Sequence, residues 1–271
     1  MSGGERTLVQ GIEVWSEGQG PRTIVMVHGW PDTHRLWDQT VAALKGQYRC
    51  VRFTLPGFDL GAPPRPTALA DMSALLSRIV EAVSPTQAVT LLTHDWGCVF
   101  GYEFAARHPA QVERMVAVDI GDHNAPALQK SLSAKARRQV FGYQLWLALA
   151  WGLGRTLSPA LGNRMTRWMA RALRCPADPA TIGWQMNYPY AMQWLGWSGG
   201  LRDALPVNPG CPLLYIYGER KLFMFHSPQW LAQLAQRPGC AVQALGTGHW
   251  VMLEQPSAFN GCVRAWLDAA A

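Results

Sequence analysis

Three things are scarce in this chain of 271 residues: charged side chains, long apolar runs and closely spaced cysteines. Charged residues make up only 15%, against about 25% in an average globular protein, while 49% of residues are hydrophobic. This balance excludes a disordered chain and favours a globular protein with a deep core. The longest apolar run, Leu145 to Leu153, is about half of the roughly 18 residues that a membrane-spanning helix needs.

The six cysteines lack any CxxC spacing, so the sequence indicates neither a zinc site nor a disulfide framework. No apolar signal-peptide stretch follows Met1. We therefore expect a cytoplasmic protein.

Charge is distributed unevenly along the chain. Residues 125–205 hold ten Lys or Arg and two acidic residues, a net charge of +8. The rest holds 14 basic and 16 acidic residues, a net charge of −2. A step of this size predicts that 125–205 is a subdomain inserted into a core formed by 1–124 and 206–271.

Outside that insert, short β-branched runs alternate with helical patterns, which is typical of a parallel sheet with crossover helices. Residues 23–27 form a continuous apolar run, as a strand buried on both faces requires. Residues 8–15 alternate like a single edge strand. The other expected strands are 49–54, 88–92, 114–118, 212–217 and 241–245, and the expected helices are 34–45, 68–83, 96–108, 227–236 and 256–269. In such sheets the chemistry lies at the carboxyl ends of the strands.

The first candidate follows the strand at 88–92, in the segment Thr93-His94-Asp95-Trp96-Gly97. A sharp strand-to-helix turn between small residues pushes its central side chain into a pocket, and the usual pattern is Gly-x-Ser-x-Gly. Here the central residue is Asp95. A carboxylate attacks an alkyl carbon and leaves an ester that water must cleave. The simpler alternative is that Asp95 only caps the helix that follows.

A second candidate segment, His28-Gly29-Trp30-Pro31-Asp32, follows the strand at 23–27. The backbone amides of Trp30 and Trp96 are the expected oxyanion-hole donors. We expect His28 to anchor its loop by hydrogen bonds, and His94 to be a packing residue.

The third candidate is His249, in Gly246-Thr247-Gly248-His249 after the last expected strand. A histidine at that place, late in the chain, suits a general base.

Together, HGWPD, HDWG and the late GH resemble the α/β-hydrolase superfamily, in the branch that includes epoxide hydrolases and haloalkane dehalogenases. Leu55-Pro56-Gly57-Phe58 is similar to a loop of the same superfamily. The resemblance spans nearly the whole chain. It implies a mostly parallel sheet flanked by helices, with 125–205 as a helical cap, and it implies no cofactor and no metal.

One position departs from this pattern. The family often places the acidic partner of the histidine in a GxxD motif after the strand at 212–217, but this chain has Lys221 there. A cation cannot orient an imidazole. Some dehalogenases of this branch carry the acid after the preceding strand, where this chain has Asp119. We expect Asp119 to be the partner, with Asp122 second and Glu219 third.

The cap offers candidate acids for opening an epoxide ring, a step that needs a weak acid such as tyrosine. Epoxide hydrolases use two cap tyrosines, one within a YQ segment. Tyr143-Gln144 resembles that segment, and Tyr188 and Tyr190, after Asn187, are candidates for the second. The alternative is that these tyrosines only line an apolar cap and take no part in catalysis.

The cap also contains a basic amphipathic helix, with Arg164, Arg167, Arg171 and Arg174 at helical spacing. Its simplest role is a solvated face. The alternatives are attraction of anionic substrates or weak contact with an acidic membrane surface. Nucleic acid is not an expected partner, since no recognition motif accompanies the charge. The oligomeric state stays open.

The sequence thus predicts an epoxide hydrolase that forms a covalent ester on Asp95 and releases a vicinal diol from a small apolar epoxide. The alternative is a haloalkane or haloacid dehalogenase with the same nucleophile, although Trp30 replaces the Asn or Glu common after HG in that family. A third reading is a binding protein without turnover, motivated by Lys221.

Overall fold

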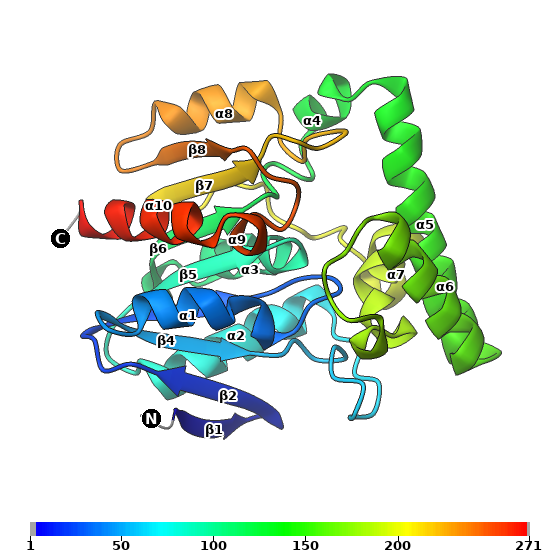
Figure 1. Ribbon diagram of the computed structural model, residues 1–271, viewed down its shortest axis with the longest axis horizontal. Helices are drawn as coiled ribbons and strands as arrows, with labels where there is room; N and C mark the ends of the chain where they lie inside the picture. The colour runs from blue at the N-terminus through cyan, green and yellow to red at the C-terminus, as the bar shows by residue number, and fades with distance from the viewer. Residues whose placement is uncertain (1–3, 270–271) are drawn as a thin grey trace.

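The computed structural model describes residues 4–269, where an eight-stranded sheet is flanked by helices (Figure 1). The strand order is β1-β2-β4-β3-β5-β6-β7-β8. Pairs β1–β2 and β2–β4 are antiparallel and every later pair is parallel, which confirms the mostly parallel sheet. The strands are β1 (Glu5–Val9), β2 (Ile12–Glu17), β3 (Arg22–Val27), β4 (Tyr48–Phe53), β5 (Val89–His94), β6 (Val112–Val118), β7 (Leu213–Gly218) and β8 (Ala241–Leu245).

Helices cover both faces of the sheet and bury two separate apolar clusters, so the central strands read as continuous apolar runs. One face is covered by α1 (Asp38–Leu44), α9 (Val251–Glu254) and α10 (Pro256–Asp268). The other is covered by α2 (Leu69–Val83), α3 (Trp96–Arg107) and α8 (Pro228–Ala235).

The amino-terminal edge differs from the prediction. Residues 8–15 are not one strand, because β1 and β2 form an antiparallel hairpin that turns at Gln10 and Gly11. Both turn residues have positive φ, 48° and 80°, as a two-residue hairpin turn requires. The alternation of side chains continues across so short a turn, so the pattern alone reads as one strand.

A helical region is inserted between β6 and β7, as predicted. Serines cap the two longest of its helices: the Ser133 hydroxyl accepts from the Ala136 amide, and the Ser158 hydroxyl from the Leu161 amide. Its helices are α4 (Pro126–Ser131), α5 (Ala134–Thr156), α6 (Pro159–Ala172) and α7 (Tyr188–Leu195). Helices α5, α6 and α7 gather at one end of the sheet (Figure 1). No helix between residues 4 and 269 combines the length and the apolarity needed to cross a membrane.

Candidate active site

Asp95 occupies the sharp turn between β5 and α3. Its backbone has φ 53° and ψ −125°, a strained conformation for a residue with a side chain. Its carboxylate makes no capping hydrogen bond to α3, the helix that follows, so Asp95 does not serve as a helix cap. Instead, Oδ1 accepts a hydrogen bond of 2.7 Å from the backbone N–H of Trp30. The turn thus leaves the carboxylate free to line a cavity.

Two glycines let the segments around Asp95 approach closely. A Cβ on Gly29 would lie 2.5 Å from Oδ1 of Asp95 and 2.5 Å from the amide nitrogen of Trp96. A Cβ on Gly97 would lie 2.3 Å from the carbonyl oxygen of Val27. These contacts are too short for any side chain, so both positions require glycine.

Thr93 stands where the motif usually has its first glycine. Space for it comes from α3, since a Cβ on Gly101 would lie only 2.8 Å from the Thr93 methyl group. The Thr93 hydroxyl donates to the carbonyl oxygen of Val116 on the neighbouring strand. The turn therefore tolerates Thr93 because a small residue lies opposite.

His249 lies between two carboxylates. Its Nε2 is 3.5 Å from Oδ2 of Asp95, and its Nδ1 hydrogen-bonds Oδ2 of Asp119. Asp119 directly follows β6, is completely buried, and has a positive φ of 72°. Burial alone would lower the pKa of His249, but the two carboxylates outweigh it and raise the pKa to about 9.

Lys221 does not displace the acid; it supports it. Its ammonium group pairs with Oδ1 of Asp119, and the backbone N–H of Gly218 donates to the same oxygen at 3.1 Å. Burial would raise the pKa of Asp119, but the charges of Lys221 and His249 lower it. Asp119 therefore stays ionised, with Oδ1 held by Lys221 and Gly218 and Oδ2 by His249.

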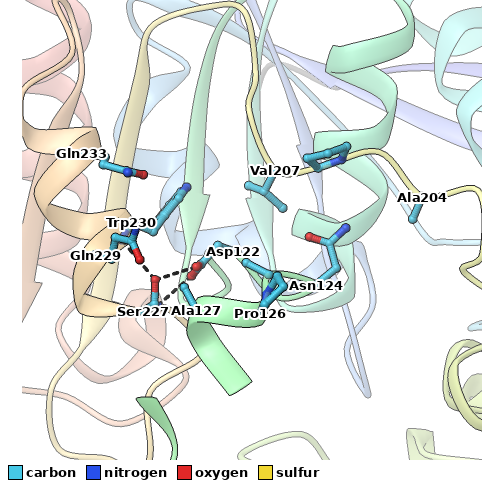
Figure 2. Close-up of a pocket in the computed structure, with 12 residues that line it drawn as sticks. Asp122, Asn124, Pro126, Ala127, Ala204, Val207, Ser227, Gln229, Trp230 and Gln233 are labelled. Atoms are coloured by element: carbon cyan, nitrogen blue, oxygen red, sulfur yellow. Dashed lines mark hydrogen bonds between the residues drawn. The ribbon is translucent and has the colours of Figure 1, made fainter. Parts of the chain in front are cut away.

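The other two acids lie elsewhere. Figure 2 shows the Asp122 carboxylate turned toward Ser227, whose backbone N–H and hydroxyl donate to it at 2.7 and 2.6 Å. It lines a separate hollow of about 430 Å³ between α4 and α8. Glu219 is exposed. Of the three candidates, only Asp119 is within hydrogen-bonding distance of His249.

A cavity of about 720 Å³ opens over Asp95 and His249, with two of the three cap tyrosines in its wall. Tyr143 comes from α5 and Tyr190 from α7, with 6.2 Å between ring centroids. Burial, reinforced by the negative Asp95, raises the pKa of the Tyr190 hydroxyl well above its ordinary value. Burial likewise raises the pKa of Tyr143. Both groups stay protonated and can donate a proton.

Tyr188 lies outside that lining. Its ring packs edge-on against Phe58 and is completely buried. Asn187, just before it, joins the cap to the core: its Oδ1 accepts from the Trp30 side chain at 2.8 Å, and its Nδ2 donates to Thr166 at 2.7 Å. Sequence reasoning assigned Asn187 no role beyond marking the tyrosines that follow.

The remaining motif residues are buried scaffold. Leu55 N–H donates to Nε2 of His28, and burial lowers the His28 pKa to about 3, which confirms the expected loop anchor. Burial also lowers the pKa of His94 to about 4, and its Nε2 donates to the carbonyl oxygen of His249. Burial raises the pKa of Asp32 to about 7, with Trp250 Nε1 donating to its carboxyl group. Within residues 4–269, no three His, Cys, Asp or Glu side chains come together as a metal site would require.

Comparison with known proteins identifies the family and the fold. The alpha/beta hydrolase family matches residues 24–261. A crystal structure of a Bacillus megaterium epoxide hydrolase variant superimposes with a TM-score of 0.70, at 20% identity, over 97% of this chain and all of that one. A haloalkane dehalogenase variant from Bradyrhizobium elkanii has a TM-score of 0.68 at 19% identity, over 98% and 96% of the two chains. These structures share the predicted fold.

Two curated relatives carry different names. The protein is 35% identical over 111 residues to "Probable oxidoreductase EphD" of Mycobacterium tuberculosis, a match that covers 39% of this chain and only 18% of that protein. It is 25% identical over 291 residues to a cis-3-alkyl-4-alkyloxetan-2-one decarboxylase of Xanthomonas campestris, covering 95% of this chain and 93% of that one.

Proposed function

Since the chain belongs to the alpha/beta hydrolase family, we propose that it is an epoxide hydrolase with Asp95 as nucleophile. One observation carries the proposal: Asp95 and His249 are opposed, across the same cavity, by two protonated tyrosines on the cap. A carboxylate nucleophile suits attack on an alkyl carbon, and a pair of weak acids suits an epoxide oxygen.

In the first step, Oδ2 of Asp95 attacks one epoxide carbon and the bond from that carbon to the ring oxygen breaks. Tyr143 or Tyr190 donates a proton to that oxygen as it becomes an alkoxide. Oδ1 stays on the Trp30 N–H, which fixes the carboxylate for attack. The product of this step is an ester between the substrate and Asp95.

In the second step, His249 takes a proton from a water molecule that attacks the ester carbonyl carbon. The N–H groups of Trp30 and Trp96 hold the oxyanion of the tetrahedral intermediate. As that intermediate collapses, protonated His249 gives its proton to the departing oxygen and a vicinal diol is released. The Asp95 carboxyl group, which now holds one oxygen from water, loses its proton to the tyrosinate left by the first step, and the enzyme returns to its starting state. Asp119 and, to a smaller extent, Asp95 raise the pKa of His249; esterification removes the Asp95 charge, so the pKa falls and His249 more readily acts as a base.

Dehalogenation is a weaker candidate because of Trp30. A leaving halide needs N–H donors that are free to face it, but the Trp30 side-chain N–H is donated to Asn187. The hydroxyl groups of the tyrosines can give a proton to an oxygen, whereas a halide leaves without one.

Decarboxylation of an oxetan-2-one is the second candidate, supported by the near full-length match to a protein named for that reaction. The substrate class, a strained ring containing oxygen, is close to an epoxide. The same nucleophile and tyrosines face the cavity in either case.

The deciding experiment is a single turnover in water enriched in heavy oxygen. We expect a terminal epoxide to give diol and to leave the label in Asp95, found by mass spectrometry of its peptide. An active enzyme with unlabelled Asp95 would overturn the mechanism.

A parallel panel distinguishes the reactions by product. It measures diol from epoxides, halide from haloalkanes and carbon dioxide from a cis-3,4-dialkyl oxetan-2-one, with Asp95→Ala as control. Halide release without diol would make the protein a dehalogenase. Carbon dioxide release without diol would make it a lactone decarboxylase. Ligand binding without any product would support the reading as a binding protein.

A further inference from the structure

The outward side of α6 carries an unusual mixture of side chains. Arg164, Trp168 and Arg171 recur at helical spacing and are all exposed. Trp168 is 54% exposed, and Leu157, in the turn that leads into the helix, is 71% exposed. We call these four residues the α6 face. A helix face that only contacts water needs no exposed apolar side chains, whereas apolar side chains beside arginines are typical of a helix at a membrane interface.

The surrounding cap repeats this mixture. In the part of the chain that the structure describes, seven of the nine large apolar side chains that are exposed belong to residues 125–205. The same segment holds ten Lys or Arg against two acidic residues. The seven are Phe141, Leu149, Leu157, Trp168, Trp194, Leu195 and Leu205.

Helix α6 also carries a hollow rich in arginine, whose lining includes Arg164 and Arg171 of the α6 face. It has a volume of about 360 Å³ and is lined by Ala160, Asn163, Arg164, Arg167 and Arg171. Three guanidinium groups around one hollow suit a phosphate group, because guanidinium donors match phosphate oxygens in geometry and charge.

The carboxyl end of α6 forms part of the wall of the catalytic cavity. Residues 172–174, which end α6 and follow it, line that cavity, and Leu222, 84% exposed, lines it too. Leu173 and Leu222 therefore give the cavity wall an apolar part at the end of α6, in the same cavity that Asp95 lines.

We propose that the α6 face binds the surface of a bilayer containing anionic phospholipids. Trp168 and Leu157 enter the headgroup region, and Arg164 and Arg171 pair with lipid phosphates. Self-association through this face is disfavoured because it would bring two segments of net charge +8 together. Vesicle binding needs no turnover, so its outcome is independent of the proposed function.

The test is cosedimentation of the full chain with two kinds of vesicle, one of phosphatidylcholine alone and one with a third of its lipid replaced by phosphatidylglycerol. We expect binding to the anionic vesicles only, and release at high salt. Arg164→Gln with Arg171→Gln should weaken binding roughly 5-fold per arginine, as expected for basic residues at an anionic surface. Trp168→Gln should weaken it further.

The matched control is Arg35→Gln with Arg78→Gln, which removes the same charge from exposed sites on the core. The control should bind like the parent, and thermal unfolding should show that every variant folds. No binding to anionic vesicles, or equal binding by both double variants, would overturn the proposal. A dimer that Trp168→Gln dissociates, without vesicle binding, would instead make this face a contact between copies.

Discussion

At the scale of single residues, the charge balance around Asp119 governs the histidine. Lys221 and the Gly218 amide use one carboxylate oxygen, so the other remains for Nδ1 of His249. A lysine in the place expected for the acid therefore leaves the contact between Asp119 and His249 intact. It keeps Asp119 ionised in a site where burial alone would favour its neutral form.

Replacing this acid should separate the two chemical steps. In Asp119→Asn, formation of the Asp95 ester needs only Asp95 and the tyrosines, so it should continue. Hydrolysis should slow by roughly 10³–10⁴-fold, because His249 loses the carboxylate that sets its tautomer and supports its charge. Intact-protein mass spectrometry should then show the enzyme heavier by one substrate.

Glu219→Gln is the control for that variant, since Glu219 is exposed. It should turn over like the parent. If it accumulates ester while Asp119→Asn does not, the acid lies on the loop after β7.

Low pH should produce the same accumulation in the unmodified protein. His249 lowers the pKa of Asp95 against the effect of burial, so the nucleophile stays ionised in mild acid. Hydrolysis needs neutral His249, and its pKa of about 9 in the free protein falls once Asp95 is esterified. As pH drops through that lower value, His249 protonates and hydrolysis stops first. Quenched-flow measurement of the ester should show its level rising toward acid pH; a level that stays constant would contradict this assignment.

The tyrosines offer a prediction with an internal control. Tyr143→Phe and Tyr190→Phe should each slow ester formation from an epoxide, by up to 10²–10⁴-fold where no second acid compensates. Tyr188→Phe should leave ester formation unchanged, because Tyr188 does not line the cavity. Single-turnover rates compare the three variants. Loss of rate in Tyr188→Phe alone would instead identify Tyr188 as the proton donor and contradict the assignment of Tyr143 and Tyr190.

At the scale of elements, two of the three glycines of α5 have opposite surroundings. A Cβ on Gly142 would meet nothing within 4 Å, whereas a Cβ on Gly154 would lie 2.4 Å from Cγ of the buried Trp184. Gly142→Ala should stabilise the protein by about 0.5–1 kcal/mol, since alanine is the better helix former. Gly154→Ala should destabilise it by about 1–3 kcal/mol through overpacking. Urea unfolding of both variants tests the pair, and equal shifts would contradict the packing of α5 on Trp184.

At the scale of the whole molecule, the sequence predicts those site residues that the order of the parallel strands brings together. Asp95, Asp119 and His249 each lie beyond the end of a strand, and the Trp30 amide follows another. Parallel strands deliver such residues to one edge, so their meeting could be expected from strand order. Strand order could not predict which of Tyr188 and Tyr190 lines the cavity. That choice depends on how α7 is rotated against the core, and that rotation is set by contacts such as Trp30 with Asn187.

That contact gives the prediction for the molecule as a whole. Asn187→Ala leaves the buried Trp30 side-chain N–H without its acceptor, at a cost of about 1–3 kcal/mol, and frees α7 from the core. Hydrogen exchange should therefore quicken both in the cap and at the amides of residues 28–30, in the loop whose Trp30 amide holds Asp95. Asn163→Ala is the matched control, because it removes a hydrogen bond to Trp184 that lies entirely within the cap. In Asn163→Ala, hydrogen exchange should quicken only at amides of the cap. If the amides of residues 28–30 exchange in Asn187→Ala as slowly as in the parent, the cap does not help to hold this loop, and the two halves of the site are positioned independently.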